Sequence, residues 1–204
     1  MRNNILISVL LALLFALAGC QAPWLQGGAP YTTGKSEYTL RTPAGWVFSE
    51  QPPGNIIATK DGVILQQFTV EIREFQNAFP ASKRALSAGL TPLELAEAFT
   101  DDMRANRGLL GLEVKETKLA QIDGRAGFKV VVSFHTNDKL RLSQVIYGCI
   151  EKDRLYLLRL AAPTRYYFDR DSPAFEEAVK SFHFGKHAST AAVDREGSSQ
   201  TAHR

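Results

Sequence analysis

Apolar and polar residues alternate along much of the chain, which is the pattern of half-buried β-strands. Phe68, Val70 and Ile72, for example, are each followed by a polar residue. Runs of this kind, bounded by turn residues, predict strands over 38–41, 46–48, 56–59, 63–75, 112–121, 128–134 and 139–150 and from residue 154 onward. Asp-Gly pairs at 61–62 and 123–124 are typical of hairpin turns. We therefore expect antiparallel hairpins.

One segment between these strands has helical spacing instead. Thr91 precedes Pro92, and Glu94 follows three residues after Thr91, so both partners of a capping box are present. Leu95 and Phe99, four residues apart, begin an apolar stripe, while the charged residues face water: Glu94, Glu97, Asp101 and Arg104. The pattern predicts a helix that starts at Pro92 and buries this stripe.

A second helix is predicted to begin at Ser172-Pro173, because Phe175, Val179 and Phe182 follow the same spacing. Each helix has one apolar face to bury, and a sheet with one dry face offers the surface for it. The predicted fold class is therefore α+β, an antiparallel β-sheet with helices packed on it.

The N-terminal segment has a different character. Arg2 precedes an almost purely apolar run over residues 5–17. As a helix this run is about 20 Å long, too short for a hydrocarbon layer of about 30 Å, and it is typical of a signal peptide. The run ends at Leu17-Ala18-Gly19-Cys20, which resembles the bacterial lipobox. Cys20 is therefore predicted to receive a diacylglycerol and to become the first residue after cleavage.

Lipidation at Cys20 would anchor the protein without spanning the membrane, since each buried methylene contributes about 0.8 kcal/mol. In Gram-negative lipoproteins an aspartate after the cysteine favours the inner membrane, and this chain has Gln21 there. The predicted location is the outer membrane, facing the periplasm. The chain is divided into a signal peptide over 1–19, a lipidated tether over 20–36, a folded domain over 37–184 and a disordered tail over 185–204.

Composition and charge exclude several classes of protein. The chain is 45% hydrophobic and 22% charged, as ordinary globular proteins are. Its net charge is only +3, and no block of like charge stands out. No nucleic-acid partner is predicted, and attraction to anionic lipid is not needed as the anchoring force.

Serine, histidine and cysteine residues are present, but not in the arrangements that catalytic or metal sites require. Ser133 and His135 share a strand face, but no G-x-S-x-G elbow accompanies them, so we interpret them as the wet face of a strand. His183 and His187 have no third ligand nearby. Cys149 alternates inward with apolar neighbours and is predicted to be a core residue. We predict no enzyme activity, no metal site and no cofactor.

Several turn and core segments are shared with a known superfamily. They are Pro43-Ala44-Gly45-Trp46, the turn over 122–126, the strand end over 158–163 and Ser181-Phe182. In these segments the chain resembles the PsbP-like superfamily, and most of all its bacterial DcrB-type lipoproteins, over about residues 37–184. The resemblance implies a sheet flanked by helices and an accessory, assembly or binding role. It implies no catalytic residue.

The segment over 76–89 is longer than a typical connection, and long connections often carry function. Its Phe79, Lys83 and Arg84 are candidates for contact with a partner; the alternative is that the segment only connects a strand to a helix. Arg154, Arg159, Arg165 and Arg170 cluster in the sequence, and the first three could face an anionic group, although alternation places Arg154 and Arg159 on opposite faces of their strand.

These observations together predict a lipid-anchored, non-catalytic envelope protein with a binding or accessory role. Its predicted partners are the membrane, through the lipid, and another envelope protein or a small ligand. The alternative is a small-ligand carrier or sensor that uses a cavity between the sheet and the helices.

Overall fold

The structure is a computed structural model of the 204-residue chain, and it describes residues 23–35, 37–52, 54–87 and 89–185. The predicted signal peptide, Cys20 and nearly all of the predicted C-terminal tail lie outside the described residues. No helix in the described ranges is long and apolar enough to cross a membrane.

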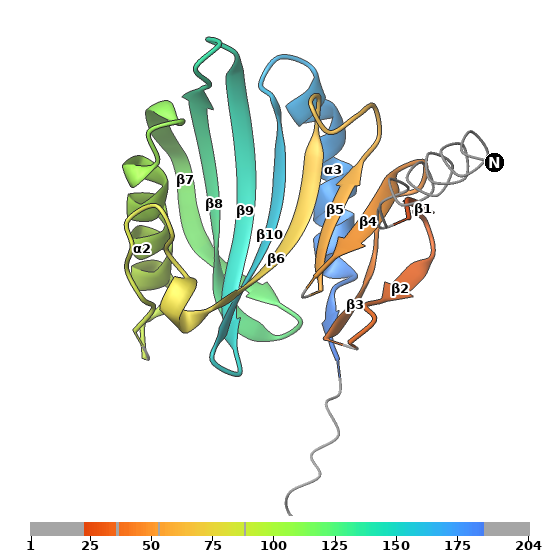
Figure 1. The fold of residues 1–204 in the computed structure, drawn as a ribbon, viewed down its shortest axis with the longest axis horizontal. Coiled ribbons are helices and arrows are strands. Elements are labelled where there is room, and N and C mark those ends of the chain that lie inside the picture. Colours follow the sequence, from red (N-terminus) through yellow and green to blue (C-terminus); the bar gives the residue numbers. More distant parts are fainter. Residues whose placement is uncertain (1–22, 36, 53, 88, 186–204) are drawn as a thin grey trace, which may run out of the picture.

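The centre of the fold is one eight-stranded antiparallel sheet with the order β1-β4-β5-β6-β10-β9-β8-β7 (Figure 1). Its strands are β1 (Leu25–Gln26), β4 (Val47–Gln51), β5 (Asn55–Thr59), β6 (Gln67–Glu74), β7 (Leu110–Ile122), β8 (Arg125–His135), β9 (Arg141–Glu151) and β10 (Arg154–Pro163). A smaller sheet has the order β11-β3-β2, with β2 (Pro30–Thr32), β3 (Tyr38–Arg41) and β11 (His183–Phe184). The predicted meander of long antiparallel strands is confirmed.

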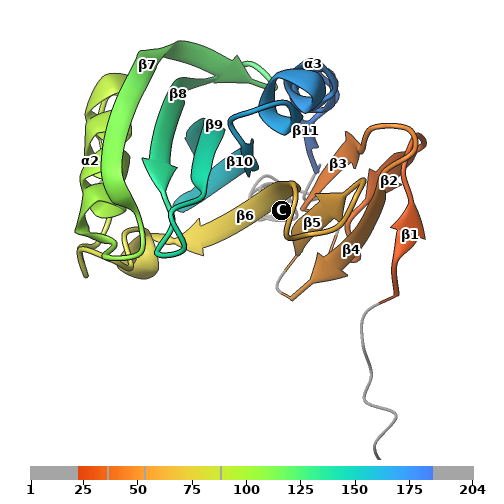
Figure 2. The same cartoon turned by 90° about the horizontal axis from the view of Figure 1, so that it is seen from above.

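The helices α2 (Pro92–Ala105) and α3 (Tyr167–Lys180) lie on opposite faces of the large sheet (Figure 2). Strand β10 separates the two cores. Tyr156 and Leu158 pack in the core beneath α3, whereas Leu155 and Leu157 pack in the core beneath α2. The α+β fold class is confirmed, but the sheet buries apolar residues on both faces, whereas the sequence pattern predicts only one dry face.

Helix α2 begins as predicted. The Thr91 hydroxyl accepts a hydrogen bond from the Glu94 backbone N–H at 3.3 Å, and a Glu94 carboxylate oxygen accepts one from the Thr91 backbone N–H at 2.8 Å. This reciprocal capping box satisfies two of the backbone groups that a helix start leaves unpaired. The local sequence signal was therefore sufficient to fix this end of the helix.

The predicted start of the second helix is wrong, because α3 begins at Tyr167 and contains Pro173 in its interior. The Ser172 hydroxyl donates to the Phe168 carbonyl at 2.6 Å, within the additional turn. Arg170 holds the same turn by its ion pair with Asp171 at 2.7 Å. Side-chain interactions thus extend the helix ahead of the proline, which alone is typical of a first helical position.

The predicted tether and one predicted hairpin turn also differ from the structure. Strands β1 and β2 lie within the segment predicted as a tether, and the Gly27 N–H donates to the Trp46 carbonyl at 2.8 Å, so the folded body begins before residue 37. The β5–β6 connection extends over residues 60–66 and is longer than the predicted tight turn. The Asp123-Gly124 turn is confirmed, with φ values of 47° and 74° that suit a two-residue hairpin.

Cys149 is a core residue, as predicted. Its side chain is fully buried, and burial raises the pKa of its thiol to about 12. A thiol of this kind is almost entirely protonated at neutral pH and is therefore a poor nucleophile.

Candidate functional site

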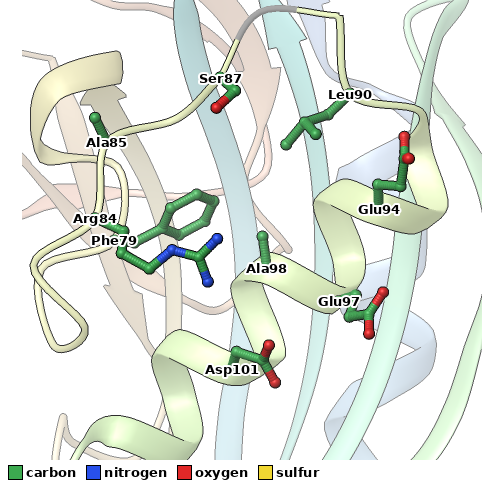
Figure 3. A pocket seen from close by; sticks show the side chains of 9 residues that line it. All are labelled: Phe79, Arg84, Ala85, Ser87, Leu90, Glu94, Glu97, Ala98 and Asp101. Carbon is green, nitrogen blue, oxygen red and sulfur yellow. The ribbon is translucent and has the colours of Figure 1, made fainter.

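The connection between β6 and α2 folds back against the outer side of α2 and encloses a hollow of about 280 Å³ (Figure 3). The lining residues come from the connection and from one stripe of the helix. They are Phe79, Arg84, Ala85, Ser87, Leu90, Glu94, Glu97, Ala98 and Asp101. We call this feature the loop–α2 hollow.

Hydrogen bonds hold the connection in this position. The Leu86 N–H donates to the Phe75 carbonyl at 2.7 Å, which closes the segment into a compact loop. Asp102, a buried residue of α2, accepts hydrogen bonds from the Ser82 backbone N–H at 2.7 Å and from its hydroxyl at 3.0 Å. A carboxylate that accepts two hydrogen bonds ties the loop to the helix more firmly than neutral contacts would.

The structure brings together two of the three candidate partner-binding residues. Phe79 is buried and Arg84 is exposed, and both line the loop–α2 hollow. A backbone bridge pairs them, since the Arg84 N–H donates to the Phe79 carbonyl at 3.2 Å. Lys83 is exposed at the turn between them, with φ of 56°, but does not line the hollow.

The helix side of the loop–α2 hollow is acidic. Glu94 belongs to the capping box, and the backbone N–H of Thr91 holds the pKa of its carboxyl below the usual value. Asp101 forms an ion pair with Arg104 at 2.8 Å, and Glu97 has no ion pair with a described residue. Arg84 extends towards this face of α2 (Figure 3). The hollow therefore joins a buried aromatic ring to a rim of both charge signs with an acidic excess.

Sequence reasoning missed the acidic residues of the hollow because it assigned them to the water-facing side of α2. Glu94, Glu97 and Asp101 follow one another at intervals of three and four residues and so share one side of the helix. That spacing was visible in the sequence. What it could not show is that the preceding loop folds over this side.

A second polar cluster lies on the same face of the sheet, between α2 and β5. Arg159 on β10 forms an ion pair with Glu71 on β6 at 2.8 Å, and Arg73 donates to Glu71 from Nε at 3.0 Å and from Nη2 at 3.1 Å. Burial alone would raise the pKa of Glu71, but the two guanidinium groups outweigh it and lower this pKa. Arg154 instead pairs with Glu37 at 2.7 Å, so the predicted separation of Arg154 from Arg159 is confirmed.

Arg159 lies between two further hollows. One, of about 190 Å³, lies between the sheet and α2 and includes Arg73, Asp102 and Gln144 among its lining residues. The other, of about 220 Å³, lies over β5 and β6. Typical small-molecule sites occupy roughly 300–1,000 Å³, so all three hollows are smaller than that range.

The remaining candidate groups for chemistry are placed as follows. Ser133 is buried, so its predicted place on the wet face of the strand is wrong. Its hydroxyl accepts a hydrogen bond from the Arg141 guanidinium at 3.4 Å, and a guanidinium cannot act as a base. His135 is exposed. His183 Nδ1 lies 2.8 Å from an Asp123 carboxylate oxygen, and His187 is outside the described residues. Within the described ranges, no group of three His, Cys, Asp or Glu residues could hold a metal ion.

Comparison with known proteins identifies the fold family. The solution structure of cyanobacterial PsbP (CyanoP) from Synechocystis sp. PCC 6803 has a TM-score of 0.56 at 16% identity, over 83% of this chain and 99% of that chain. The Ran-binding protein Mog1p from Saccharomyces cerevisiae has a TM-score of 0.52 at 11% identity, over 81% of this chain and 96% of that chain. At such identities the likeness shows a shared fold.

Sequence comparison shows which residues match the family. No curated protein sequence matches the chain. The family model described as PsbP matches residues 26–184, which is more than half of the chain and begins within β1. The chain therefore belongs to the PsbP family.

Proposed function

We propose that this protein is a lipid-anchored, non-catalytic accessory protein of the bacterial envelope, attached through Cys20 to the outer membrane and facing the periplasm. The observation that carries the anchor is the Leu17-Ala18-Gly19-Cys20 motif at the end of a short apolar run. Membership of the PsbP family supports an accessory or binding role. The feature that would carry the binding role is the loop–α2 hollow.

Replacement of Cys20 by alanine is expected to release the protein from the membrane fraction and to abolish incorporation of labelled palmitate. The physical reason is that the acyl chains supply the anchoring free energy, about 0.8 kcal/mol per buried methylene. Fractionation of cells on a density gradient measures the effect, with the wild type expected in the outer-membrane fraction. Cys149→Ala is the matched control, because that thiol is buried in the core and its loss should leave attachment unchanged. Membrane attachment of Cys20→Ala would overturn the anchor.

The dimensions and charges of the loop–α2 hollow favour a protein segment as its partner. At about 280 Å³ it could accept one or two side chains. Phe79 supplies an apolar base, and the acidic excess from Glu97 and Asp101 favours a partner segment with a basic side chain. Mog1p, which shares the fold, is a Ran-binding protein, so a protein partner has a precedent in this fold.

A photoreactive amino acid in place of Ala85, on the rim of the hollow, is expected to form a specific crosslink to one envelope protein in intact cells. Combining it with Glu97→Lys and Asp101→Lys should weaken that crosslink several-fold, because the rim then repels a basic segment. The matched control carries the photoreactive residue at Lys152, in the exposed β9–β10 turn. Equal crosslinking from both positions, or none from position 85, would contradict a partner at the hollow.

A second candidate function is the binding of a small polar molecule between the sheet and α2. The side-chain oxygen of Gln144 is buried without a hydrogen-bond partner among the described residues, and Gln144 lines the hollow of about 190 Å³ beside Arg159. An unpaired buried polar atom is destabilising, and a bound hydrogen-bond donor would relieve it. Native mass spectrometry of the protein purified from its own membrane distinguishes this function, since it requires a bound small molecule that Gln144→Leu removes.

A further inference from the structure

Four chain connections lie together at one end of the large sheet. The register places Leu110 beside His135, His135 beside Arg141, and Pro163 beside Leu142. Ala161 pairs with Gln67, which brings the start of β6 to the same end. This end, the upper edge of the sheet in Figure 1, comprises residues 60–66, 106–110, 136–140 and 164–166. We call these residues the loop end.

Each of the four connections exposes one large hydrophobic side chain. Ile64 is 88% exposed, Tyr166 64%, Leu110 47% and Leu140 44%. These are half of the exposed large hydrophobic residues in the described chain; the others are Trp24, Leu93, Val114 and Leu119. Single exposed apolar residues are common, but here one lies in or directly beside each of four connections at the same end of the sheet, so together they give this end an apolar character.

Each connection also carries one exposed basic residue close to its apolar side chain. They are Lys60, Arg107, Lys139 and Arg165, and none forms an ion pair with a described residue. Two acidic residues lie at the loop end, and one of these, Asp61, is already bound by Arg170 at 2.6 Å. The loop end therefore combines exposed apolar tips with unpaired positive charge, although the chain as a whole has a net charge of only +3.

Tyr166 is held outward in a strained backbone conformation. Its φ of 82° and ψ of −62° are unfavourable for a bulky side chain, and such strain is concentrated at functional positions. The Arg170 guanidinium lies 5.3 Å from the Tyr166 ring centroid and 4.9 Å from that of Tyr167, which fixes the exposed ring. An aromatic ring with a polar tip is suited to the boundary between lipid and water.

The start of the described chain is within reach of this end. Gln26 pairs with Val47, which pairs with Thr59, the last residue before the 60–66 connection. Cys20 is six residues before Gln26, and six residues span at most about 21 Å. A lipid on Cys20 would therefore keep the bilayer within about 21 Å of Gln26, whose neighbours in the sheet lead directly into the 60–66 connection.

We propose that the loop end docks on an anionic bilayer surface, with Ile64, Leu140 and Tyr166 at the lipid boundary and the basic residues against phosphate groups. The proposal rests on the lipid anchor of the proposed function, which keeps the bilayer at a high effective concentration so that weak contacts suffice. Docking fixes the orientation of the molecule. The opposite end of the sheet then points away from the membrane, and the side of the molecule formed by α2 and its hollow stays accessible.

The test uses the full lipidated chain in vesicles of phosphatidylethanolamine and phosphatidylglycerol. Ile64→Cys provides a thiol for an environment-sensitive fluorophore, because Cys20 is acylated and the Cys149 thiol is buried. Lipids that carry a quencher near the headgroup are expected to quench this label strongly. The same label at Lys152→Cys, at the opposite end of the sheet, is expected to show little quenching. Lys139→Glu combined with Arg165→Glu should reduce quenching at position 64 to the level of the control.

Three results would count against the proposal in different ways. Equal quenching at positions 64 and 152, in protein that floats with the vesicles, would overturn docking while leaving the anchor intact. Quenching as strong in phosphatidylcholine vesicles would overturn the role of anionic lipid. Protein that does not float with the vesicles would overturn the anchor and, with it, the orientation.

Discussion

Replacing Glu71 by glutamine is expected to reduce the free energy of unfolding by about 2 to 3 kcal/mol at neutral pH. The Glu71 carboxylate accepts two hydrogen bonds from Arg73 and lies 2.8 Å from Arg159 Nη2, so it neutralises two guanidinium groups at once. Without it, two partly buried like charges face each other. Breaking a fully buried pair costs about 3 to 5 kcal/mol, and the loss here is smaller because these side chains keep some exposure to water.

The pH dependence of this loss follows from the lowered pKa of Glu71. Burial would raise this pKa, but Arg159 and Arg73 hold it below the ordinary value of 4.5. The ionised carboxylate is therefore stabilised by folding, and its contribution is complete above about pH 4.5 and is lost as the pH falls through the pKa of the folded state. Urea unfolding of wild type and Glu71→Gln should show a difference that is largest at neutral pH and narrows in acid.

Glu177→Gln is the matched control for this experiment. Glu177 pairs with Lys180 at 2.7 Å, but both side chains are about 70% exposed (72% and 70%). Exposed pairs contribute about 0 to 1 kcal/mol, so this change should barely affect unfolding. A similar loss in both variants, or a Glu71→Gln loss that persists undiminished in acid, would contradict the account.

The parts of the fold that could be predicted are those determined by residues close together in the sequence. The capping box at Thr91 and the Asp123-Gly124 turn each depend on residues next to one another in the sequence, and both are present in the structure. The predicted start of α3 is wrong because Pro173 is equally a local signal, whereas the turn before it is also held by the ion pair of Arg170 with Asp61, which is 109 residues away in the sequence. Local reasoning fails where a tertiary contact competes with the local preference.

The sequence of β10 does indicate that the sheet is buried on both faces, although a search for apolar–polar alternation alone does not detect it. In β10, Leu155 and Leu157 occupy the face opposite Tyr156 and Leu158, so the strand is apolar on both sides. A nearly continuous apolar run is typical of a strand covered on both faces. The signal indicates that each face has a cover, but not which helix covers it.

The candidate site was predictable only in part for a similar reason. The length of the β6–α2 connection pointed to Phe79 and Arg84, which do line the hollow. The partnership of Arg159 with Glu71 requires that β10 pair with β6 in one register, and residues so far apart in sequence carry no sign of that pairing. The ion cluster of Arg159, Glu71 and Arg73 can therefore be recognised only once the strand order of the sheet is known.

Gly127→Ala is expected to cost about 3 kcal/mol or more of folding free energy, for a reason that concerns the backbone. A Cβ atom at position 127 would lie 2.3 Å from the Gly148 carbonyl oxygen and 2.9 Å from the Cys149 Cβ. Strand β8 pairs with β9 at this point, with Gly127 opposite Cys149. Neither strand can move away without losing ladder hydrogen bonds, and overpacking of a rigid core commonly costs about 1 to 3 kcal/mol even where side chains can adjust.

Substitutions at two further glycines serve as controls, because they add a Cβ atom without a clash against backbone atoms. At Gly148 an added Cβ would lie 2.4 Å from two carbons of the Phe128 ring. This ring is fully buried, but a side chain can adjust more than a paired backbone carbonyl can, so Gly148→Ala should cost less than Gly127→Ala. Gly45 has φ of 77° with no atom near the added Cβ, so Gly45→Ala should cost only about 1 kcal/mol. In thermal and urea unfolding, the loss of stability should be largest for Gly127→Ala, intermediate for Gly148→Ala and smallest for Gly45→Ala. If Gly127→Ala were no less stable than Gly45→Ala, strain at positive φ rather than close strand approach would dominate, and the tight β8–β9 contact would be wrong.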